Sequence, residues 1–352
     1  MSWFELAIVV MIFYMVLIHK FQKGWKRLKS FKGKYEGSIS VVIAARNEEE
    51  TIAQLLTDLA QQTITNFEVI VVDDHSTDQT TKIAQGFDFV TLLKAEAEGK
   101  KAAVAQGVAH AKNDIVITTD ADCRLPKEWL EKMLAPFAEE DIQLVVGPVA
   151  FSEEQNYFEK GQSLEFMSLI GSGAGAIATE KAFMCNAASL AFRKSIFSKT
   201  SDEIVSGDDV FLLHHIKKEG GEIAFVKEQS AIVTTSAKEN WKSLLQQRQR
   251  WAAKSSSYTD KDAQYISWLV FLVNAVLLYA FFQGEYSQIA SLLLLKSLVD
   301  YPFLKKLSQF FKKESLMDYY IPLQLVYPFY IVYVAVASQL GSFEWKGRKH
   351  SK

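Results

Sequence analysis

The sequence predicts an α/β protein with a mostly parallel sheet, flanked by apolar helices near both ends of the chain. Between residues 36 and 262, short Val- and Ile-rich runs alternate with stretches of helical pattern. Near-continuous apolar runs of this kind are typical of parallel strands covered on both faces. The ends of the 352-residue chain carry longer apolar runs, where much of its 49% hydrophobic content is concentrated. Runs of that length predict membrane segments on either side of a water-exposed domain.

The first expected element is an N-terminal transmembrane anchor over residues 1–20. Residues 6–18 are continuously apolar, and Trp3 and Phe4 extend the run toward the roughly 17–20 residues that a spanning helix needs. Lysines and an arginine follow the run instead of preceding it, which argues against a cleaved signal peptide. By the positive-inside rule, the domain that follows lies in the cytoplasm. A buried or interfacial helix is the alternative.

Residues 263–345 are expected to supply about three more transmembrane or membrane-associated helices. The apolar segments cover residues 266–282, 289–304 and 319–340. The third is the candidate for a re-entrant or interfacial segment, because Pro322 and Pro328 interrupt its helical pattern. Lys296 and Asp300 lie four residues apart in the second segment, so they share a helix face. They form either a structural ion pair or a site for an acceptor or a lipid headgroup.

Charge and cysteine content exclude two broad classes. The formal net charge of −2 provides no basic field of the kind that neutralises phosphates, so nucleic acid is not an expected partner. Cys123 and Cys185 lie far apart and lack the spacing of a disulfide framework or a zinc site. This composition fits a reducing compartment.

Polar residues follow the predicted strands of residues 36–262, which we expect to form the catalytic domain. Ligands of parallel sheets bind at the carboxyl ends of the strands. Arg46 follows the first strand and is a cation that could meet a phosphate. Asp73 and Asp74 follow the second strand and could accept hydrogen bonds from a base or ribose, although aspartate pairs are also common in turns.

Asp120 and Asp122 follow the fourth predicted strand. Two hard oxygen ligands one residue apart suit Mg²⁺ or Mn²⁺ bridged to substrate phosphates. Taken alone, this pattern is more often a turn than a metal site. Lys100 begins a helix after Gly99 and is either a solvated charge or a residue that helps to hold the same phosphates.

Two further polar clusters lie later in the chain. Asp208 and Asp209 precede an amphipathic stretch, where they are either helix caps or an acid/base site. The run QRQRW ends at Trp251, just before the first C-terminal apolar segment, and such clusters are often interfacial anchors. The small-residue run at 171–176, GSGAGA, lacks the setting of a dinucleotide-binding turn, and we expect a flexible loop near the membrane.

The ordered set of motifs resembles family 2 of the inverting glycosyltransferases, which have a GT-A (Rossmann-like) fold. The motifs are VVIAARNEEETI, VVDDHSTD, TTDADC, SGDD and QRQRW. They occur in family order and resemble those of membrane-anchored members such as ceramide glucosyltransferase-like and polysaccharide synthase-like enzymes. The resemblance implies that Asp74, with Asp73 beside it, contacts the nucleotide base. It also implies that Asp120 and Asp122 meet the donor diphosphate through a divalent ion.

The resemblance assigns roles to the later clusters as well. Asp209 matches the catalytic base and Asp208 the acidic residue before it, while Gln247, Arg250 and Trp251 match QxxRW, near the donor diphosphate and the acceptor. A base is needed because an acceptor hydroxyl is a poor nucleophile until its proton is removed. The metal and the Arg250 guanidinium would stabilise the departing diphosphate.

The expected protein is therefore a metal-dependent hexosyltransferase of the cell membrane. It would move sugar from a nucleotide-sugar donor, with UDP-sugar the first candidate, to a membrane lipid or lipid-linked acceptor during cell-envelope biogenesis. Its catalytic domain would face the cytoplasm. One alternative is a polysaccharide synthase subunit, which would need an accessory membrane subunit because four apolar segments are too few to line a channel. Another is a catalytically silent nucleotide-binding membrane scaffold, against which the intact carboxylates argue.

Overall fold

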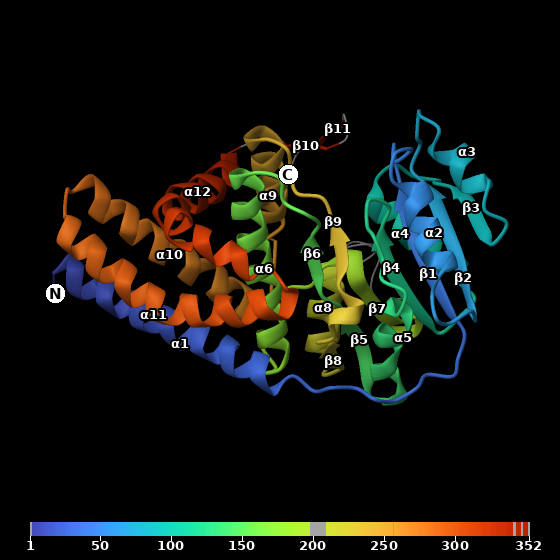
Figure 1. The fold of residues 1–352 in the computed structure, drawn as a ribbon, viewed down its shortest axis with the longest axis horizontal. Coiled ribbons are helices and arrows are strands. Elements are labelled where there is room, and N and C mark those ends of the chain that lie inside the picture. The colour runs from blue at the N-terminus through green and yellow to red at the C-terminus, as the bar shows by residue number, and fades with distance from the viewer. Residues whose placement is uncertain (1, 198–208, 256, 341–342, 346–347, 351–352) are drawn as a thin grey trace. The chain divides into compact units, whose positions relative to one another are not determined.

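The computed structural model describes residues 2–197, 209–255, 257–340, 343–345 and 348–350 (Figure 1). The chain divides into two compact units. The sheet unit comprises Arg27–Ser152 and Ala176–Ser236, and the helical unit comprises Met1–Lys26, Glu153–Gly175 and Ala237–Lys352. Each unit draws on segments that are distant in sequence, so neither is a continuous stretch of chain.

The sheet unit contains a seven-stranded sheet with the order β3-β2-β1-β4-β7-β5-β8. The strands are β1 (Ile39–Ala45), β2 (Phe67–Asp73), β3 (Val90–Lys94), β4 (Ile115–Asp120), β5 (Ile142–Val146), β7 (Leu190–Arg193) and β8 (Glu222–Phe225). Strand β7 is antiparallel to both β4 and β5, whereas the other pairs in this sheet are parallel. The predicted mostly parallel sheet is therefore confirmed.

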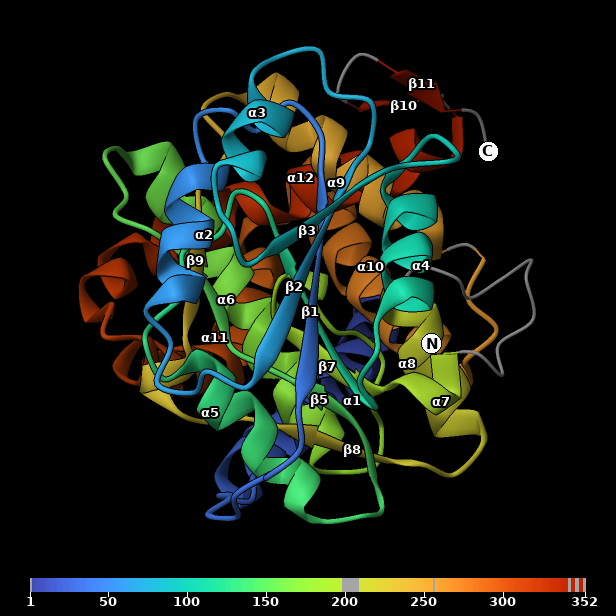
Figure 2. The same ribbon diagram turned by 90° about the vertical axis from the view of Figure 1, so that its right-hand side faces the viewer.

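Helices cover both faces of the parallel part of this sheet. They include α2 (Ile52–Ala60), α3 (Thr80–Gln85), α4 (Lys100–His110) and α5 (Trp129–Leu134). Figure 2 shows α2 and α4 on opposite sides of β1 and β2. Six of the seven residues of β1 are buried, which explains its near-continuous apolar sequence. A Cβ at Gly107 of α4 would lie 2.5 Å from Val42 Cγ1, so glycine permits the close approach of α4 to β1.

The rest of the sheet unit is made of short elements. They are the parallel pair β6 (Val149–Phe151) and β9 (Val233–Thr235), the helices α7 (Lys194–Phe197) and α8 (Asp209–Lys218), and the 3₁₀ helices η1 (Ala135–Ala138), η2 (Ala187–Ser189) and η3 (Gln229–Ala231). Among them, η2 and the start of α8 contribute to the site described below.

The helical unit contains the expected N-terminal helix and three C-terminal helices. Its helices are α1 (Trp3–Arg27), α6 (Tyr157–Ile177), α9 (Trp241–Ser255), α10 (Lys261–Phe282), α11 (Tyr286–Phe311) and α12 (Tyr320–Leu340), with the 3₁₀ helix η4 (Glu314–Tyr319) before α12. A short hairpin near the C-terminus pairs β10 (Phe343–Trp345) with β11 (Arg348–His350). Among the described residues, three helical segments are long and apolar enough to cross a membrane, namely Trp3–Arg27, Lys261–Phe282 and Glu314–Gln339.

The prolines of the last apolar segment do not interrupt its helix, contrary to the expectation from the sequence. Pro322 lies in the first turn of α12, where a missing N–H costs nothing, and Pro328 is accommodated inside the helix. By contrast, α11 is not among the candidate spans found in the described residues. Charged residues along α11, including Lys296 and Asp300, lower its hydropathy.

The GSGAGA run is helical, so the prediction of a flexible loop was wrong. It lies within α6, and its glycines allow neighbouring helices to approach closely. A Cβ at Gly175 would lie 2.3 Å from the carbonyl oxygen of Phe21 in α1, and one at Gly171 would lie 2.3 Å from Leu307 Cδ1 in α11. These glycines serve helix packing, as small residues do at the interfaces of membrane helices.

A buried polar network joins α1, α11 and α12 within the helical unit. Lys296 and Asp300 are only 3% and 7% exposed, and they form an ion pair. Lys296 Nζ also donates to Gln324 Oε1 at 2.7 Å, and the Tyr14 hydroxyl donates to Asp300 Oδ1 at 2.9 Å. Because both charges are satisfied by neighbouring helices, this geometry favours the structural ion pair over a ligand site.

The glycine contacts lead to a matched pair of substitutions in α6. Gly175→Ala should lower the free energy of unfolding by about 1–3 kcal/mol, because the new Cβ overlaps backbone atoms of α1. Gly161→Ala should be neutral or stabilising, since its Cβ would meet only Leu323 Cδ1 at 3.9 Å. Thermal and denaturant unfolding of the purified protein in detergent would compare the two. Equal stability of both variants would contradict the packing role of Gly175.

Candidate active site

The carboxyl ends of β1, β2 and β4 lie side by side at one edge of the sheet. In the parallel register, Asp73 is opposite Ala45 and Asp120 is opposite Ala44. Asp74 and Arg46 directly follow two of these strand ends. The sheet therefore brings these predicted donor-binding residues to a common edge, as expected for ligand sites of parallel sheets.

The acidic residues after β2 hold the surrounding loops. Asp74 is only 1% exposed. Its carboxylate accepts a hydrogen bond at 3.0 Å from the N–H of Gly99, which directly precedes α4. Arg46 Nη1 donates to the Asp74 carbonyl oxygen at 2.9 Å, and Asp73 accepts the Ser76 N–H at 3.3 Å. These contacts order the edge of the site. Direct contact of either aspartate with a nucleotide base stays a prediction.

The loops after β1 and β2 also hydrogen-bond to each other. Asn47 Oδ1 accepts the Thr77 N–H at 2.8 Å, and the Asn47 N–H donates to Ser76 Oγ at 3.0 Å. Asn47 and His75 have φ values of 50° and 57°, in the left-handed region that few side chains adopt. Mutual hydrogen bonding offsets the cost of this backbone and fixes the two loops as one surface.

Lys100 and Asp120 form a close ion pair at the end of β4. Lys100 Nζ lies 2.5 Å from Asp120 Oδ1, and both side chains are about one-third exposed, at 35% and 31%. Asp122 lies in the turn that follows β4 and is half-buried. This arrangement pairs a cation with a carboxylate at the sheet edge. A role of Lys100 in holding the donor stays a prediction.

The donor set fits a metal ion that shares its ligands with a substrate. Within the described residues, no cluster of three or more His, Cys, Asp and Glu side chains could hold an ion alone. Two carboxylates from Asp120 and Asp122 instead match Mg²⁺ or Mn²⁺, which commonly take one or two carboxylates plus phosphate oxygens and water. The residues present therefore fit an ion bound together with a diphosphate.

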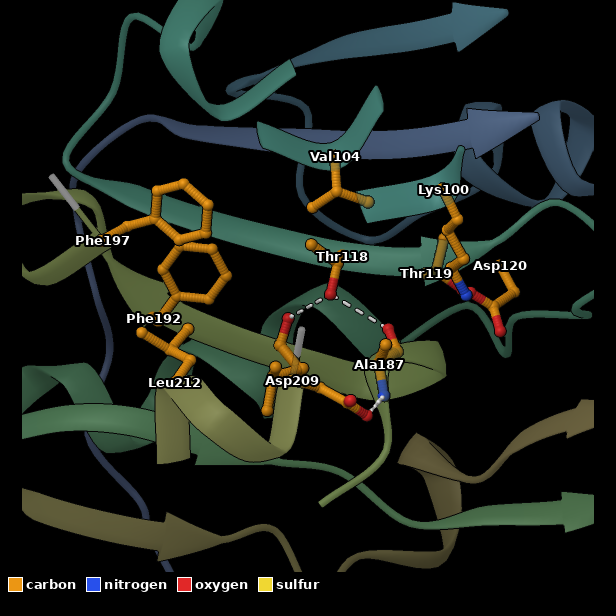
Figure 3. Close-up of a pocket in the computed structure, with 11 residues that line it drawn as sticks. Lys100, Val104, Thr118, Thr119, Asp120, Ala187, Phe192, Phe197, Asp209 and Leu212 are labelled. Atoms are coloured by element: carbon orange, nitrogen blue, oxygen red, sulfur yellow. Dashed lines mark hydrogen bonds and ion pairs between the residues drawn. The ribbon is translucent and has the colours of Figure 1, made fainter. Parts of the chain in front are cut away.

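A pocket joins this edge to the start of α8 (Figure 3). The pocket is small, with a cavity volume of about 30 Å³, and its polar lining includes Lys100, Thr119, Asp120 and Asp209. The Asp209 carboxylate accepts the Ala187 N–H at 2.9 Å. One wall is apolar, and Figure 3 shows Phe192 and Leu212 on that side. The structure thus brings together three predicted site residues from α4, β4 and α8.

Asp209 occupies the position expected of a catalytic base or a helix cap. It begins α8, where the positive end of the helix stabilises a carboxylate. Its hydrogen bond to the Ala187 N–H fixes one carboxylate oxygen beside the pocket. Asp208, the other predicted catalytic residue, lies outside the described residues.

The QRQRW motif lies on α9 in the helical unit. Its arginine Arg248 is buried, although the sequence offered no reason to select this residue. Arg248 is 5% exposed. Its Nη2 donates to Glu165 Oε2 at 2.8 Å, and its Nη1 donates to Gln247 Oε1 at 2.5 Å. Its guanidinium lies 4.4 Å from the centroid of the Trp251 ring. Arg248 therefore fixes two of the three motif residues that were predicted to bind the donor.

Glu165 of α6 completes this network. Its Oε1 accepts a hydrogen bond from the Tyr330 hydroxyl of α12 at 3.1 Å. Burial by itself lowers the pKa of Arg248, but the adjacent Glu165 carboxylate raises that pKa above its ordinary value. The available sequence signal was a lone carboxylate, Glu165, beside the apolar residues Leu164, Phe166 and Met167. The position of Gln247, Arg250 and Trp251 relative to the donor stays a prediction.

The sheet order and the strand-end carboxylates define the class of the protein as a GT-A-like α/β fold. A mannosyltransferase from Pyrobaculum calidifontis, solved in complex with GDP-Man and Mn²⁺, has a similar fold. The TM-score is 0.60 at 18% identity, covering 93% of this chain and 99% of the other.

Residues 40–200 match the family model described as glycosyl transferase family 2. A β-monoglucosyldiacylglycerol synthase from Nostoc sp. is 30% identical over 165 residues, covering 43% of this chain and 35% of the relative. An undecaprenyl-phosphate 4-deoxy-4-formamido-L-arabinose transferase from Klebsiella pneumoniae is 32% identical over 141 residues, covering 38% and 42%, respectively. The chain thus spans less than half the length of these relatives.

The Glu165–Arg248 pair leads to a stability prediction. Glu165→Gln should lower the free energy of unfolding by about 3–5 kcal/mol, because it leaves the buried Arg248 charge without a counter-ion. The double variant Glu165→Leu with Arg248→Leu should recover most of this loss. Unfolding of the detergent-solubilised protein measures both. The control is Glu153→Gln at an exposed position, and a Glu165→Gln variant as stable as this control would contradict the assignment.

Proposed function

We propose that the protein is a membrane-bound, metal-dependent, inverting glycosyltransferase that acts on a lipid or lipid-linked acceptor. One observation carries the proposal: Lys100, Asp120 and Asp209, from three separate elements, line a single pocket. Lys100 and Asp120 lie in the segment that matches glycosyl transferase family 2, and Asp209 lies nine residues after it. This places a cation, a candidate metal ligand and a candidate base around one space. Such a set suits transfer from a donor whose leaving group is a diphosphate.

The donor would be a nucleotide sugar, with a UDP-sugar as the first candidate. The edge formed by Arg46, Asp73 and Asp74 would bind its nucleoside part, and Lys100 would approach its phosphates. Asp120 and Asp122 would hold Mg²⁺ or Mn²⁺, which would neutralise charge on the departing diphosphate. The proposal draws support from the structurally similar mannosyltransferase, which was solved with GDP-Man and Mn²⁺.

The chemistry is a single displacement. Asp209 accepts the proton of the acceptor hydroxyl while the hydroxyl oxygen forms a bond to the anomeric carbon. The bond from that carbon to the diphosphate oxygen breaks, and the configuration inverts because attack and departure occur on opposite faces. Gln247, Arg250 and Trp251 would contact the diphosphate or the acceptor, with Arg248 holding Gln247 and Trp251 in position.

The proposed acceptor is a membrane lipid because two observations point to one. Three helices within the described residues are long and apolar enough to span a membrane and would associate the chain with the bilayer. The names of the two relatives described above refer to lipids, one to monoglucosyldiacylglycerol and the other to undecaprenyl phosphate. The lysines that follow the apolar part of α1 favour a cytoplasmic sheet unit, where nucleotide sugars are made.

Replacement of the proposed base tests the mechanism. Asp209→Asn should reduce transfer by about 100- to 10,000-fold, the usual contribution of general-base catalysis, while donor affinity changes little. Membranes containing the protein would be incubated with labelled nucleotide sugars, and label would be counted in the chloroform-soluble lipid. The control is Asp141→Asn at an exposed position. Undiminished transfer by Asp209→Asn would remove the base assignment.

Replacement of the proposed metal ligand tests the donor site. Asp122→Ala should weaken metal-dependent donor binding by about tenfold or more, as expected when a metal site is disrupted. Titration calorimetry with the nucleotide sugar, in the presence of Mn²⁺ and then of a chelator, measures this effect. With the chelator, wild type and variant should bind the donor equally. A variant that keeps the full Mn²⁺ effect would contradict the metal role of Asp122.

A further inference from the structure

A large groove lies within the helical unit, apart from the pocket of the sheet unit. It is lined by α6, α9, η4 and α12, and its cavity volume is about 550 Å³. Sites for small ligands commonly span about 300–1,000 Å³. The groove therefore has room for an elongated ligand, and its lining indicates which kind.

The lining is mostly apolar or aromatic. Phe158 and Gly161 come from α6, Leu244 from α9, and Leu323 and Val326 from α12. Aromatic and aliphatic side chains of this kind bind hydrocarbon through burial of apolar surface. Aromatic rings also bind sugar faces, so the polar groups in the groove decide between a lipid chain and a glycan.

The polar side chains deep in the groove are engaged inside the protein. Gln162 Oε1 accepts the Lys238 N–H at 3.0 Å, and its Nε2 donates to the Lys238 carbonyl oxygen at 2.8 Å. Glu165 is paired with Arg248 and accepts from the Tyr330 hydroxyl. A glycan would have to satisfy many hydroxyl groups, but Gln162 and Glu165 already use their hydrogen-bonding capacity on other protein groups. The other charged lining residue, Asp318, is exposed to solvent. The groove is therefore suited to a chain without polar groups.

The groove is continuous with the apolar surface of a candidate membrane span. Val326 lines the groove and is 49% exposed. Its neighbour on α12, Leu325, is 58% exposed, and Ile321 is 63% exposed. Large apolar side chains exposed along a helix capable of spanning a membrane face lipid. A lipid chain can therefore pass between the bilayer and the groove along α12.

We propose that this groove binds one hydrocarbon chain of the lipid acceptor. The identity of this lipid as the acceptor rests on the proposed function. Glu165 connects the groove to the motif helix, because it lines the groove and also holds Arg248. Arg248 in turn contacts Gln247 and Trp251. Occupation of the groove and the arrangement of the QxxRW motif thus share one buried ion pair, which makes the groove the lipid-chain part of the acceptor site.

The test uses a photoreactive lipid and needs no transfer reaction. The full chain would be reconstituted in phosphatidylcholine vesicles with a small fraction of diacylglycerol carrying a diazirine in one acyl chain. Labelled peptides would be identified by mass spectrometry. The expected result is saturable labelling of α6 and α9 residues such as Phe158, Gly161 and Leu244, which are outside the candidate spans. Unlabelled diacylglycerol should compete for these positions.

Two adjacent residues of α12 provide matched variants. Val326→Trp adds bulk to the groove and should reduce labelling of α6 and α9 by about tenfold, as expected when about two buried methylene groups are displaced. Leu325→Trp places the same new side chain on the other, lipid-facing side, outside the groove lining, and should leave this labelling unchanged. Gly161→Phe fills the groove from α6 and provides a second variant if Val326→Trp does not fold.

Three outcomes would overturn the proposal. The first is labelling that is confined to the candidate spans. The second is labelling of α6 and α9 that neither unlabelled diacylglycerol nor the groove-filling variants reduce. The third is preferential labelling of the groove by a photoreactive oligosaccharide. The last would indicate a glycan site. Because labelling is measured without a nucleotide sugar, a labelled groove with no detectable transfer would leave the groove assignment intact and remove only the proposed function. Transfer to lipid without groove labelling would support the proposed function and remove the groove assignment.

Discussion

The parallel pairing of β1 with both β2 and β4 is the constraint on which the sheet unit depends. It aligns Asp73 with Ala45 and Asp120 with Ala44, so carboxylates that are distant in sequence meet at one edge. Gathering negative charge is unfavourable unless nearby groups offset it. Here the offset comes from Lys100 beside Asp120 and from backbone N–H groups that donate to Asp74 and Asp209. The fold thereby prepares an edge that suits a cation and a diphosphate.

In the helical unit, too, nearby groups offset each buried charge. The setting there is apolar, so a charge without a partner would cost far more free energy. The buried charges of Glu165 and Asp300 each have a cationic partner and a tyrosine hydroxyl donor. Each network also joins different helices, with Glu165 linking α6, α9 and α12 and Asp300 linking α1 to α11. Because satisfying these charges requires particular neighbours, the two networks specify the packing of the bundle as well as stabilise it.

The sequence was sufficient to predict the parallel sheet, the strand ends that carry Asp73, Asp74 and Asp120, and the apolar helices, since local periodicity reports these features directly. It was insufficient where a residue acts through a distant partner. Gly175 suggested a loop because its contact with α1 is not visible along the chain. Arg248 was not selected because only the fold shows that it pairs with Glu165. Likewise, Pro328 suggested a break that the packed helix accommodates.

A lipid acceptor imposes a physical demand that a soluble acceptor does not. Exposing hydrocarbon to water costs about 0.8 kcal/mol per methylene, so moving a chain of about a dozen methylenes through water costs on the order of 10 kcal/mol. A binding site for such a chain must therefore open directly to the bilayer. Val326 meets this condition, because it belongs both to the groove and to the exposed apolar side of α12. A chain that enters along this side stays out of water, so only the polar end of the lipid has to leave the membrane to react.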